Sequence, residues 1–484
     1  MASVTDTRPA AVIVLAAGEG TRMRSRTPKV LHRIGGRSLI ARAVRAAAGV
    51  RPEHLVVVVG VSRDRVAAHV LEEEPSARAV VQEEQCGTGH AAQCALAALP
   101  ELTGTVLVTY GDTPLLTAET LGHLVGVHEE AANAVTVLTA RIDDPTGYGR
   151  ILRHDDGSVA GIVEERDADD AQRAVQEINS GIYAFEATVL ATALQRLRPD
   201  NAQGELFLPD VLALARADGH RVGALGIADG WQTEGVNDRV QLARLGAELN
   251  RRTVERHQRA GVSVVDPAST WIDDTVVIEA DATLLPGVQL HGLTSVATGA
   301  TIGPDTTLTD VEVGEQASVV RTHGAGAVIG AGASVGPFAY LRPGTRLGAD
   351  AKIGTFVETK NAAIAAAVKV PHLSYVGDAE IGEGSNIGAG TIFANYDGVS
   401  KHRTTVGTHC STGSNNTFVA PVEVGDGAAT GAGTVVRRDV PPGALAVSTG
   451  PQRNLEDWTL RKRPGTQAAE AATRAQDRTE ETRP

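Results

Sequence analysis

A glycine-rich turn with two cations close behind it is the first stretch that could do chemistry. Gly18 and Gly20 follow the apolar run 11–17, which we expect to be a buried strand, and Arg22 and Lys29 come soon afterwards. Backbone N–H groups at such a turn can approach a phosphate chain, and the cations can neutralise it. The stretch lacks the Gly-Lys-Ser/Thr ending of a Walker loop and the three spaced glycines of a Rossmann fingerprint. A Gly-x-Gly pair alone is more often an ordinary turn, but the cations favour phosphate binding.

Two more polar loops follow predicted strands. Gln82 and the segment 86–90 open a predicted helix, so they offer a side-chain amide and free helix N–H groups. Asp112 comes directly after the apolar segment 106–110. An aspartate in that position can cap a helix, stabilise a turn or bind Mg²⁺, and the residues alone leave these alternatives open.

The elements that must position these loops are alternating strands and helices. Predicted strands at 11–17, 55–59 and around 80–81 are separated by helical patterns such as 40–48. This spacing predicts a parallel, doubly wound α/β domain, whose ligands bind beyond the carboxyl ends of the strands. The glycine-rich turn and the two polar loops are therefore expected at one edge of a sheet.

The second half of the chain repeats an aliphatic residue at every sixth position. The repeat comprises Ile272, Ile278, Leu284, Leu290, Val296, Ile302 and Leu308, then Ile329, Val335, Leu341, Leu347 and Ile353, and later Ile381 and Ile387. This period fits neither an α-helix nor a two-sided strand, and it predicts a parallel β-helix whose stacked coils bury one aliphatic column. By periodicity alone, such a prism could serve only as a spacer or a trimerisation stalk.

Chemistry in the β-helix must come from segments that break the repeat. These are 311–328, 360–375 and 395–403, and the last two are expected to project as loops that can build a cleft between subunits. His372 stands next to a proline and outside the repeat. A lone histidine is more often structural or merely exposed, but this one could act as a general base.

Length and charge limit the class of protein. A chain of 484 residues is expected to form two domains, and its formal charge of −13 argues against nucleic acid or an anionic membrane as the main partner. Its three cysteines cannot form a disulfide framework. Because there is no leader-like segment and no apolar run long enough to span a bilayer, we expect a cytoplasmic protein with no membrane association.

Several motifs together resemble the sugar-1-phosphate nucleotidyltransferases. The similarity is greatest to the bifunctional family that combines N-acetylglucosamine-1-phosphate uridyltransferase and glucosamine-1-phosphate N-acetyltransferase activities. The matching stretches are 15–23, 28–29, 82 with 87–90, 110–112, 145–151, 161–164, 177–181 and 235–237. The resemblance covers nearly the whole chain. It implies a Rossmann-like nucleotidyltransferase domain followed by a left-handed β-helix, and an enzyme that makes UDP-N-acetylglucosamine, a precursor for peptidoglycan and cell-wall synthesis.

The resemblance also implies the residues of the uridyltransferase site. Leu15, Ala16, Ala17, Gly18, Gln82, Gly87 and Thr88 would hold the uridine, Arg22 and Lys29 would lie along the triphosphate of UTP, and Tyr110, Gly111, Gly149, Glu164 and Asn179 would contact the N-acetylglucosamine part. Asp112 and Asn237 would be the protein ligands of Mg²⁺. Attack of a sugar phosphate on UTP brings two anions together, so catalysis should rest on charge neutralisation and positioning, without a protein nucleophile.

In the acetyltransferase half, the resemblance implies that His372 is the general base for attack of the sugar amine on acetyl-CoA. Arg342, Lys360, Tyr375 and Asn386 would hold glucosamine 1-phosphate, and Ala389, Asn395, Tyr396, Ser414 and Ala432 would form the acetyl-CoA surface. The family is trimeric through its β-helices. One site would therefore draw Lys360, His372 and the Asn395 loop from different subunits of a homotrimer.

Two departures from the family pattern concern acetyl transfer. Thr449 stands near a position where the family commonly has a basic residue that meets the CoA phosphates, and the nearest cations here are Arg453 and the pair 437–438. The segment 363–368 is rich in alanine where glycine or polar corner residues are expected. Alanine at a corner with positive φ would be strained, so we expect the loop carrying His372 to be displaced or less stable.

Two rival functions are an enzyme with nucleotidyltransferase activity alone and a non-catalytic scaffold of the same two folds. The first predicts loss of the set around Lys360 and His372, and the second predicts loss of Arg22, Lys29 or Asp112, yet all are present. The expected domains are 1–239 for the uridyltransferase, 240–260 for a linker helix, 261–464 for the acetyltransferase and 465–484 for a disordered tail.

Overall fold

The computed structural model describes residues 8–60, 62–200, 204–448, 450 and 452–481, so Thr449 lies outside the described residues. The chain divides into two compact units, 1–316 and 317–484. The first contains the α/β domain, a long helix and the first coils of the β-helix. The second contains the later coils and two C-terminal helices.

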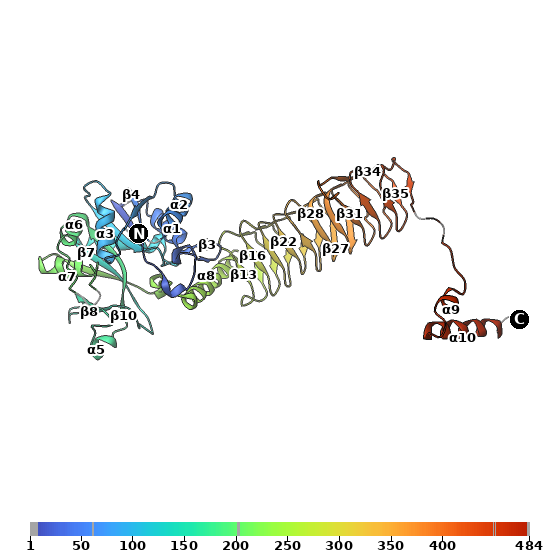
Figure 1. Ribbon diagram of the computed structural model, residues 1–484. Helices are drawn as coiled ribbons and strands as arrows, with labels where there is room; N and C mark the ends of the chain where they lie inside the picture. The colour runs from blue at the N-terminus through green and yellow to red at the C-terminus, as the bar shows by residue number, and fades with distance from the viewer. Residues whose placement is uncertain (1–7, 61, 201–203, 449, 451, 482–484) are drawn as a thin grey trace. The chain divides into compact units, whose positions relative to one another are not determined.

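The α/β domain, which runs from blue to green in Figure 1, is built on a mixed sheet. Its strand order is β11-β7-β10-β6-β1-β4-β5. Its strands are β1 (Ala11–Ala16), β4 (His54–Val59), β5 (Arg78–Val81), β6 (Thr105–Tyr110), β7 (Val135–Arg141), β10 (Glu177–Glu186) and β11 (Val222–Ile227). β1 is parallel to β4 and β6, but β10 runs antiparallel to both β6 and β7. The purely parallel sheet expected from the sequence is therefore interrupted by β10, which the chain enters from the hairpin of β8 (Arg150–Arg153) and β9 (Val159–Val163).

Helices cover both faces of this sheet because its strands are apolar on both sides. One face packs against α1 (Leu39–Gly49), α2 (Arg63–Glu73) and α4 (Ala118–Glu130), and the other against α3 (Thr88–Ala97), α6 (Ala187–Leu194) and α7 (Asp210–Ala217). Along β1, Val12 and Val14 belong to the first core and Ile13 and Leu15 to the second. This is the doubly wound arrangement expected from the sequence.

A long helix, α8 (Arg239–Arg259), follows the domain and is capped by the Asp238 side chain. Its Leu245 is buried against Leu115 and Val236 of the α/β domain. Further along α8, Asn250 donates to the Thr270 carbonyl at 2.8 Å and accepts from the Ile272 N–H at 2.9 Å. α8 is thus attached both to the α/β domain and to the first β-helix coil.

Short parallel strands form the coils in each unit. In the first unit they include β13 (Trp271–Ile272), β14 (Val277–Ile278), β15 (Thr283–Leu284), β16 (Gln289–His291) and β18 (Thr301–Ile302). In the second they include β24 (Ser334–Val335), β25 (Tyr340–Leu341), β27 (Lys352–Thr355), β28 (Glu358–Ile364), β29 (Lys369–His372), β30 (Tyr375–Ile381), β31 (Ile392–Ala394) and β33 (Thr417–Val419). Ile272 pairs with Leu290 and Val335 with Ile353, so three six-residue steps make one coil. The predicted fold class, an α/β domain followed by a left-handed parallel β-helix, is confirmed.

The alanine-rich coil before His372 is one residue short, because Leu347 pairs with Ile364, 17 residues on, whereas Ile329 pairs with Leu347, 18 residues on. Its strands remain paired with the neighbouring coils, so the expected displacement of this loop is wrong, and its lower stability stays a prediction. Ala367 adopts φ 55° at the corner, and its N–H donates to the Ala349 carbonyl at 2.8 Å. β29 then pairs with β27 so that His372 lies beside Thr355. A left-handed alanine costs roughly 1–2 kcal/mol, which the hydrogen bonds to the neighbouring coils can offset.

Two helices lie near the carboxyl terminus, α9 (Trp458–Lys462) and α10 (Gln467–Glu481). α10 lies in the segment from residue 465 onwards, for which the sequence predicts disorder. The segment is rich in alanine, glutamate, glutamine and arginine, which favour helix without needing a periodic apolar pattern. Of the helices in the described ranges, none has the length and apolar character needed to cross a bilayer.

Candidate active sites

Two adjoining cavities lie at the carboxyl ends of β1 and β6 in the α/β domain. One, of 360 Å³, is lined by Leu15, Ala16, Ala17, Gly18, Lys29, Gln82, Gly87, Thr88, Tyr110, Asp112 and Asn237 together with Val30, Gln85, Ala91 and Glu205. The other, of 530 Å³, includes Arg22, Gly149, Glu164 and Asn179 and shares Thr88 and Tyr110 with the first. Residues from all eight stretches that carry the family resemblance are therefore brought to one edge of the sheet.

Gly111 is the one residue of the predicted uridyltransferase set that lines neither cavity. Its N–H donates to the Leu15 carbonyl at 2.9 Å, which ties the end of β6 to β1. A Cβ at this position would lie 2.7 Å from Ile40 Cδ1. The absence of a side chain at Gly111 thus allows α1 to pack closely behind the cavity.

Side-chain amides shape the end of the smaller cavity near α3. Gln82 is buried, and its Nε2 donates to the Gly87 carbonyl at 3.1 Å. Gln85, which the sequence analysis did not single out, donates to the Ala17 carbonyl at 2.7 Å. Gly87 has φ +101°, and a Cβ there would lie 2.6 Å from the Leu206 carbonyl oxygen. These contacts hold the loop that begins α3 against the end of β1.

Lys29, Asp112 and Asn237 meet in the smaller cavity. Lys29 forms an ion pair with Asp112, and its Nζ also lies 3.3 Å from Asn237 Oδ1. A backbone hydrogen bond of 2.9 Å from Val236 to the Asp112 carbonyl holds the two chain segments together. One cationic group thus contacts both predicted metal-ligand oxygens, so this pair of oxygen donors fits a hard divalent cation.

Across the described residues, no group of three or more histidine, cysteine, aspartate or glutamate side chains is placed to hold a metal ion. A cation bound by Asp112 and Asn237 would therefore take its other ligands from water and substrate, which suits Mg²⁺ because this ion usually keeps several waters.

Tyr110 and Asn179 form the wall between the cavities and the floor of the larger one. Asn179 Oδ1 accepts from the Tyr183 hydroxyl at 2.8 Å and from the Gly181 N–H at 2.9 Å. Burial, followed by repulsion from Asp112, raises the pKa of Tyr110. Burial also raises the pKa of Glu164, with further contributions from neighbouring carboxylates. The larger cavity thus combines uncharged hydrogen-bonding groups, such as Tyr110 and Asn179, with the ionisable side chains of Arg22, Glu164, Glu165, Arg166 and Asp167.

In the second unit, most of the predicted glucosamine-1-phosphate residues form one cluster, together with Asn395. Lys360 Nζ lies 3.7 Å from Asp378 Oδ2, and Asn395 Nδ2 lies 3.4 Å from the Tyr375 hydroxyl and also donates to Asp378. Arg342 stands one coil before Lys360, where its Nη1 donates to Glu358 Oε1 at 2.8 Å. The sequence analysis missed the central carboxylate, Asp378.

Lys401 is a second residue of this cluster that the sequence analysis missed. A contact with Lys401, followed by the attraction of Asp378, raises the pKa of Lys360, while the same contact lowers the pKa of Lys401. Lys360 and Lys401 therefore lie near Asp378, and Arg342 lies one coil before Lys360 beside Glu358, so three cations meet two carboxylates. The remaining positive charge suits a phosphate. The signal in the sequence was a lysine within the interrupting segment 395–403.

The remaining acetyltransferase residues follow a different corner of the β-helix. His372 is exposed, and its carbonyl accepts from Gly390 at 3.2 Å in the next coil. The Ala389 carbonyl accepts from the backbone N–H of Asn415, which is next to Ser414. The Ser414 carbonyl accepts from the backbone N–H of Gly433, which is next to Ala432. Asn386 is also exposed on the strand position that leads to this corner. Ala389, Ser414 and Ala432 thus form a column over successive coils, and His372 lies at its start.

Taken together, the fold and these surfaces define a nucleotidyltransferase joined to a parallel β-helix. Residues 12–179 match the MobA-like NTP transferase domain family. The chain is 64% identical over 470 residues to the bifunctional protein GlmU of Kineococcus radiotolerans, covering 97% of this chain and 96% of that protein. It is 61% identical to that of Pseudarthrobacter chlorophenolicus over 97% of this chain and 96% of the relative. It is 60% identical to the protein of the same name from a Mycobacterium sp., over 98% of this chain and 96% of that protein.

The chain belongs to the family of the bifunctional protein GlmU. This membership confirms the prediction of a bifunctional transferase that forms UDP-N-acetylglucosamine, with uridyltransferase and acetyltransferase activities and UTP as a co-substrate. Its substrates are small molecules.

Proposed function

We propose that the two adjoining cavities of the α/β domain are the uridyltransferase site. The smaller would hold the uridine of UTP between the end of β1 and the start of α3, and the larger would hold N-acetylglucosamine 1-phosphate. The observation that carries this assignment is the shared wall of Thr88 and Tyr110, which puts a sugar phosphate beside the nucleotide. Arg22, in the larger cavity, and Lys29, in the smaller, would neutralise phosphate groups from two sides.

In the proposed reaction, a phosphate oxygen of the sugar phosphate attacks the α-phosphorus of UTP. A new P–O bond forms, the bond to the β-phosphate breaks, and pyrophosphate leaves with its electron pair. Asp112 and Asn237 are the proposed protein ligands of Mg²⁺, which would supply charge neutralisation at the phosphates. Lys29 contacts both proposed ligands, so its charge would lie beside the phosphates that the ion would help to neutralise.

In the β-helix, we propose that His372 accepts a proton from the amine of glucosamine 1-phosphate. The nitrogen attacks the carbonyl carbon of acetyl-CoA, the C–S bond breaks, and CoA leaves as its thiol. The cluster of Arg342, Lys360, Tyr375 and Lys401 supports phosphate binding, since Lys360 and Lys401 lie near Asp378 and Arg342 lies one coil before Lys360. Asn386 is proposed to contact glucosamine 1-phosphate as well. The column from Ala389 to Ser414 and Ala432, with Asn395 and Tyr396 on the projecting loop, is the proposed acetyl-CoA surface.

We infer that the enzyme is a homotrimer in which neighbouring subunits complete this second site. Phe338, Phe356 and Leu373 form an exposed apolar column beside His372 and are 53%, 58% and 60% exposed. The two phenylalanine rings stack with their centroids 5.5 Å apart. A contiguous apolar column of this kind is typical of a protein interface, and a second subunit docked on it would bring its own residues next to His372.

We further propose the domain division 1–239, 240–260 and 261–464, with α8 as the connecting element. Cytoplasmic localisation is the natural expectation for an enzyme that consumes UTP and acetyl-CoA.

The experiment that tests the proposal is acetyl-CoA-dependent acetylation of glucosamine 1-phosphate by the purified protein, followed as free thiol release. We expect turnover and, in sedimentation equilibrium, a particle three times the chain mass of 50.2 kDa. Uridylyl transfer without thiol release would instead favour an enzyme with nucleotidyltransferase activity alone. A monomer that acetylates at full rate would contradict the shared site.

A further inference from the structure

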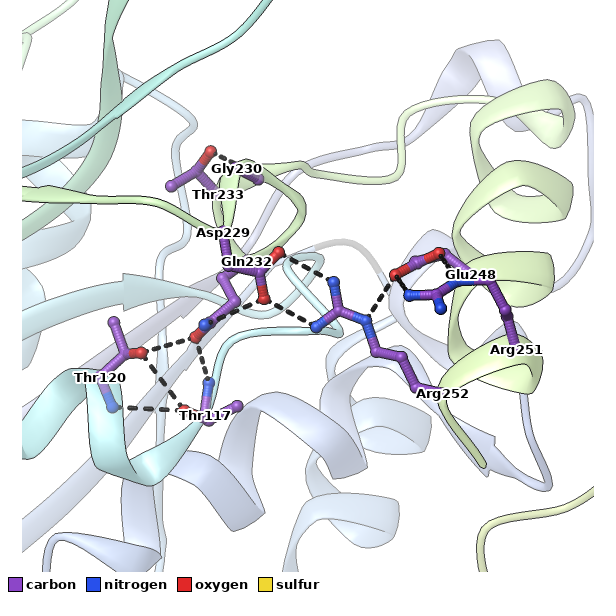
Figure 2. Close-up of polar contacts among 9 residues, drawn as sticks. All are labelled: Thr117, Thr120, Asp229, Gly230, Gln232, Thr233, Glu248, Arg251 and Arg252. Atoms are coloured by element: carbon purple, nitrogen blue, oxygen red, sulfur yellow. Dashed lines mark hydrogen bonds and ion pairs between the residues drawn. The ribbon is translucent and has the colours of Figure 1, made fainter. Parts of the chain in front are cut away.

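A polar contact joins α8 to the α/β domain at some distance along the helix from its first turn. Arg252 donates from Nη1 and Nη2 to the two carboxylate oxygens of Asp229, at 2.7 and 2.8 Å (Figure 2). Its Nε donates to Glu248 Oε1, one turn earlier on α8, at 2.6 Å. The planar guanidinium is therefore held by two carboxylates, in a bidentate geometry that a lysine could not reproduce.

Asp229 precedes a single helical turn, η3 (Gly230–Thr233), which contacts α4 on its other side. Gln232 Nε2 donates to Asp229 Oδ2 at 3.2 Å, and Gln232 Oε1 accepts from the Thr120 hydroxyl at 2.7 Å and from the Thr117 N–H at 3.3 Å (Figure 2). Thr117 is the N-cap of α4 and lies on the segment that leaves Asp112. η3 is thus tied both to α8 and to the chain that carries Asp112.

The chain that follows η3 leads directly to Asn237. Val236, which precedes it, donates its N–H to the Asp112 carbonyl at 2.9 Å and is fully buried with Leu245 of α8. The Asn237 N–H donates to Gln241 Oε1, in the first turn of α8, at 2.7 Å. Asn237 therefore sits between two attachments to α8, one in the first turn and the other at Asp229.

We propose that the Asp229–Arg252 pair is a clamp through which α8 positions Asn237 against Asp112, which makes the linker helix part of the uridyltransferase machinery. Asp229 and Arg252 are positioning residues, since they act through η3 and touch no substrate. The proposal rests on the proposed Mg²⁺ ligands. A misplaced Asn237 oxygen weakens binding of the metal, while the uridine pocket at the end of β1 is left intact.

The test uses the full-length variants Arg252→Gln and Asp229→Asn, with Mn²⁺ as the probe. Binding of Mn²⁺ in the presence of UTP is followed by electron paramagnetic resonance, beside the Mg²⁺ dependence of uridylyl transfer. Loss of an outer-shell contact typically weakens metal affinity by about 10-fold or more, and we expect that loss in each variant. The double variant should lose no more than the more severe single variant, because both changes remove one clamp.

The matched control is Arg251→Gln, the adjacent residue on the same helix. Arg251 contacts Glu248 and Glu255, both on α8, so its loss should change Mn²⁺ affinity by no more than about twofold. Acetyl transfer and the thermal unfolding midpoint report whether each variant is folded. Asp229→Asn is the milder variant, since it leaves the Arg252–Glu248 contact in place.

Equal Mn²⁺ affinities for Arg252→Gln, Asp229→Asn and Arg251→Gln would overturn the clamp. Asn237→Ala is measured beside them to separate this failure from failure of the metal site itself. If Asn237→Ala binds Mn²⁺ as tightly as the wild type, the assigned metal ligand is wrong. If it binds weakly and the clamp variants bind normally, the metal site holds and only the role of α8 fails.

Discussion

Lys29 Nζ lies 3.3 Å from Asn237 Oδ1, although the two residues are 208 positions apart in the chain. The same ammonium group forms an ion pair with Asp112, whose side chain is 18% exposed. The contact means that one positive charge joins the two proposed metal ligands. Removing that charge should affect the reaction proposed for this site.

Replacing Lys29 by methionine should therefore affect uridylyl transfer selectively. We expect its rate to fall by about 10² to 10³-fold, the usual loss when one electrostatic group at a reacting centre is removed. Acetyl transfer should be unchanged. Steady-state assays of both activities on one preparation check this, and a parallel loss of acetyl transfer would mean that Lys29 supports the fold rather than the reaction.

Gly181→Ala should impair the sugar pocket more than the nucleotide pocket, because Gly181 lines only the larger cavity, whereas Tyr110 lines both. Gly181 has φ +79°, and a Cβ there would lie 2.5 Å from Tyr110 Cε2. The ring must move, and it forms part of the wall of the larger cavity. We expect KM for N-acetylglucosamine 1-phosphate to rise by about 10-fold or more and KM for UTP to change less. Gly157→Ala is a suitable control, because it also has positive φ but has open space around its Cβ position.

His128 should make the stability of the α/β domain depend on pH. The side chain is buried in α4, its Nδ1 lies 3.0 Å from the Thr136 hydroxyl, and burial lowers its pKa to about 4. Between pH 6.5 and pH 4, His128 is protonated in the unfolded chain but stays neutral in the folded chain. The neutral histidine is therefore fully compatible with folding above pH 6.5, and about 3 kcal/mol of stability is lost as the pH falls to 4.

Thermal unfolding of the wild type and His128→Gln at pH 7.5 and pH 5 tests this expectation. The wild type should lose more stability than the variant on acidification, so the difference between the two proteins should shrink at pH 5. Parallel losses in both proteins would assign the acid sensitivity to other groups.

The sequence identifies the edge of the sheet where the site lies, because glycine-rich turns and polar residues such as Asp112 follow apolar strands. Periodicity also predicts the β-helix. It does not predict the antiparallel β10, since strand direction depends on the β8–β9 hairpin rather than on a local pattern. Periodicity does not predict the positive φ of Ala367 either, because hydrogen bonds to neighbouring coils override the preference of alanine for negative φ.

Within the site, the sequence indicates residues that lie in recognisable motifs and misses those brought in by tertiary packing. Gln85 lies inside a quoted motif, yet its contact with Ala17 depends on how α3 docks on β1. Asp378 and Lys401 join Lys360 only because coils stack in register. The clamp of Asp229 and Arg252 depends on how α8 packs along η3, which no local pattern encodes.

The central claim is that two independent sites carry out the two reactions of one chain, and Asp112→Ala and His372→Ala test it most directly. Both activities would be measured on each variant after its folding and trimeric state are checked. We predict that Asp112→Ala abolishes formation of UDP-N-acetylglucosamine while sparing acetyl transfer, and that His372→Ala does the reverse. If either folded, trimeric variant lost both activities, the division into independent sites would be contradicted.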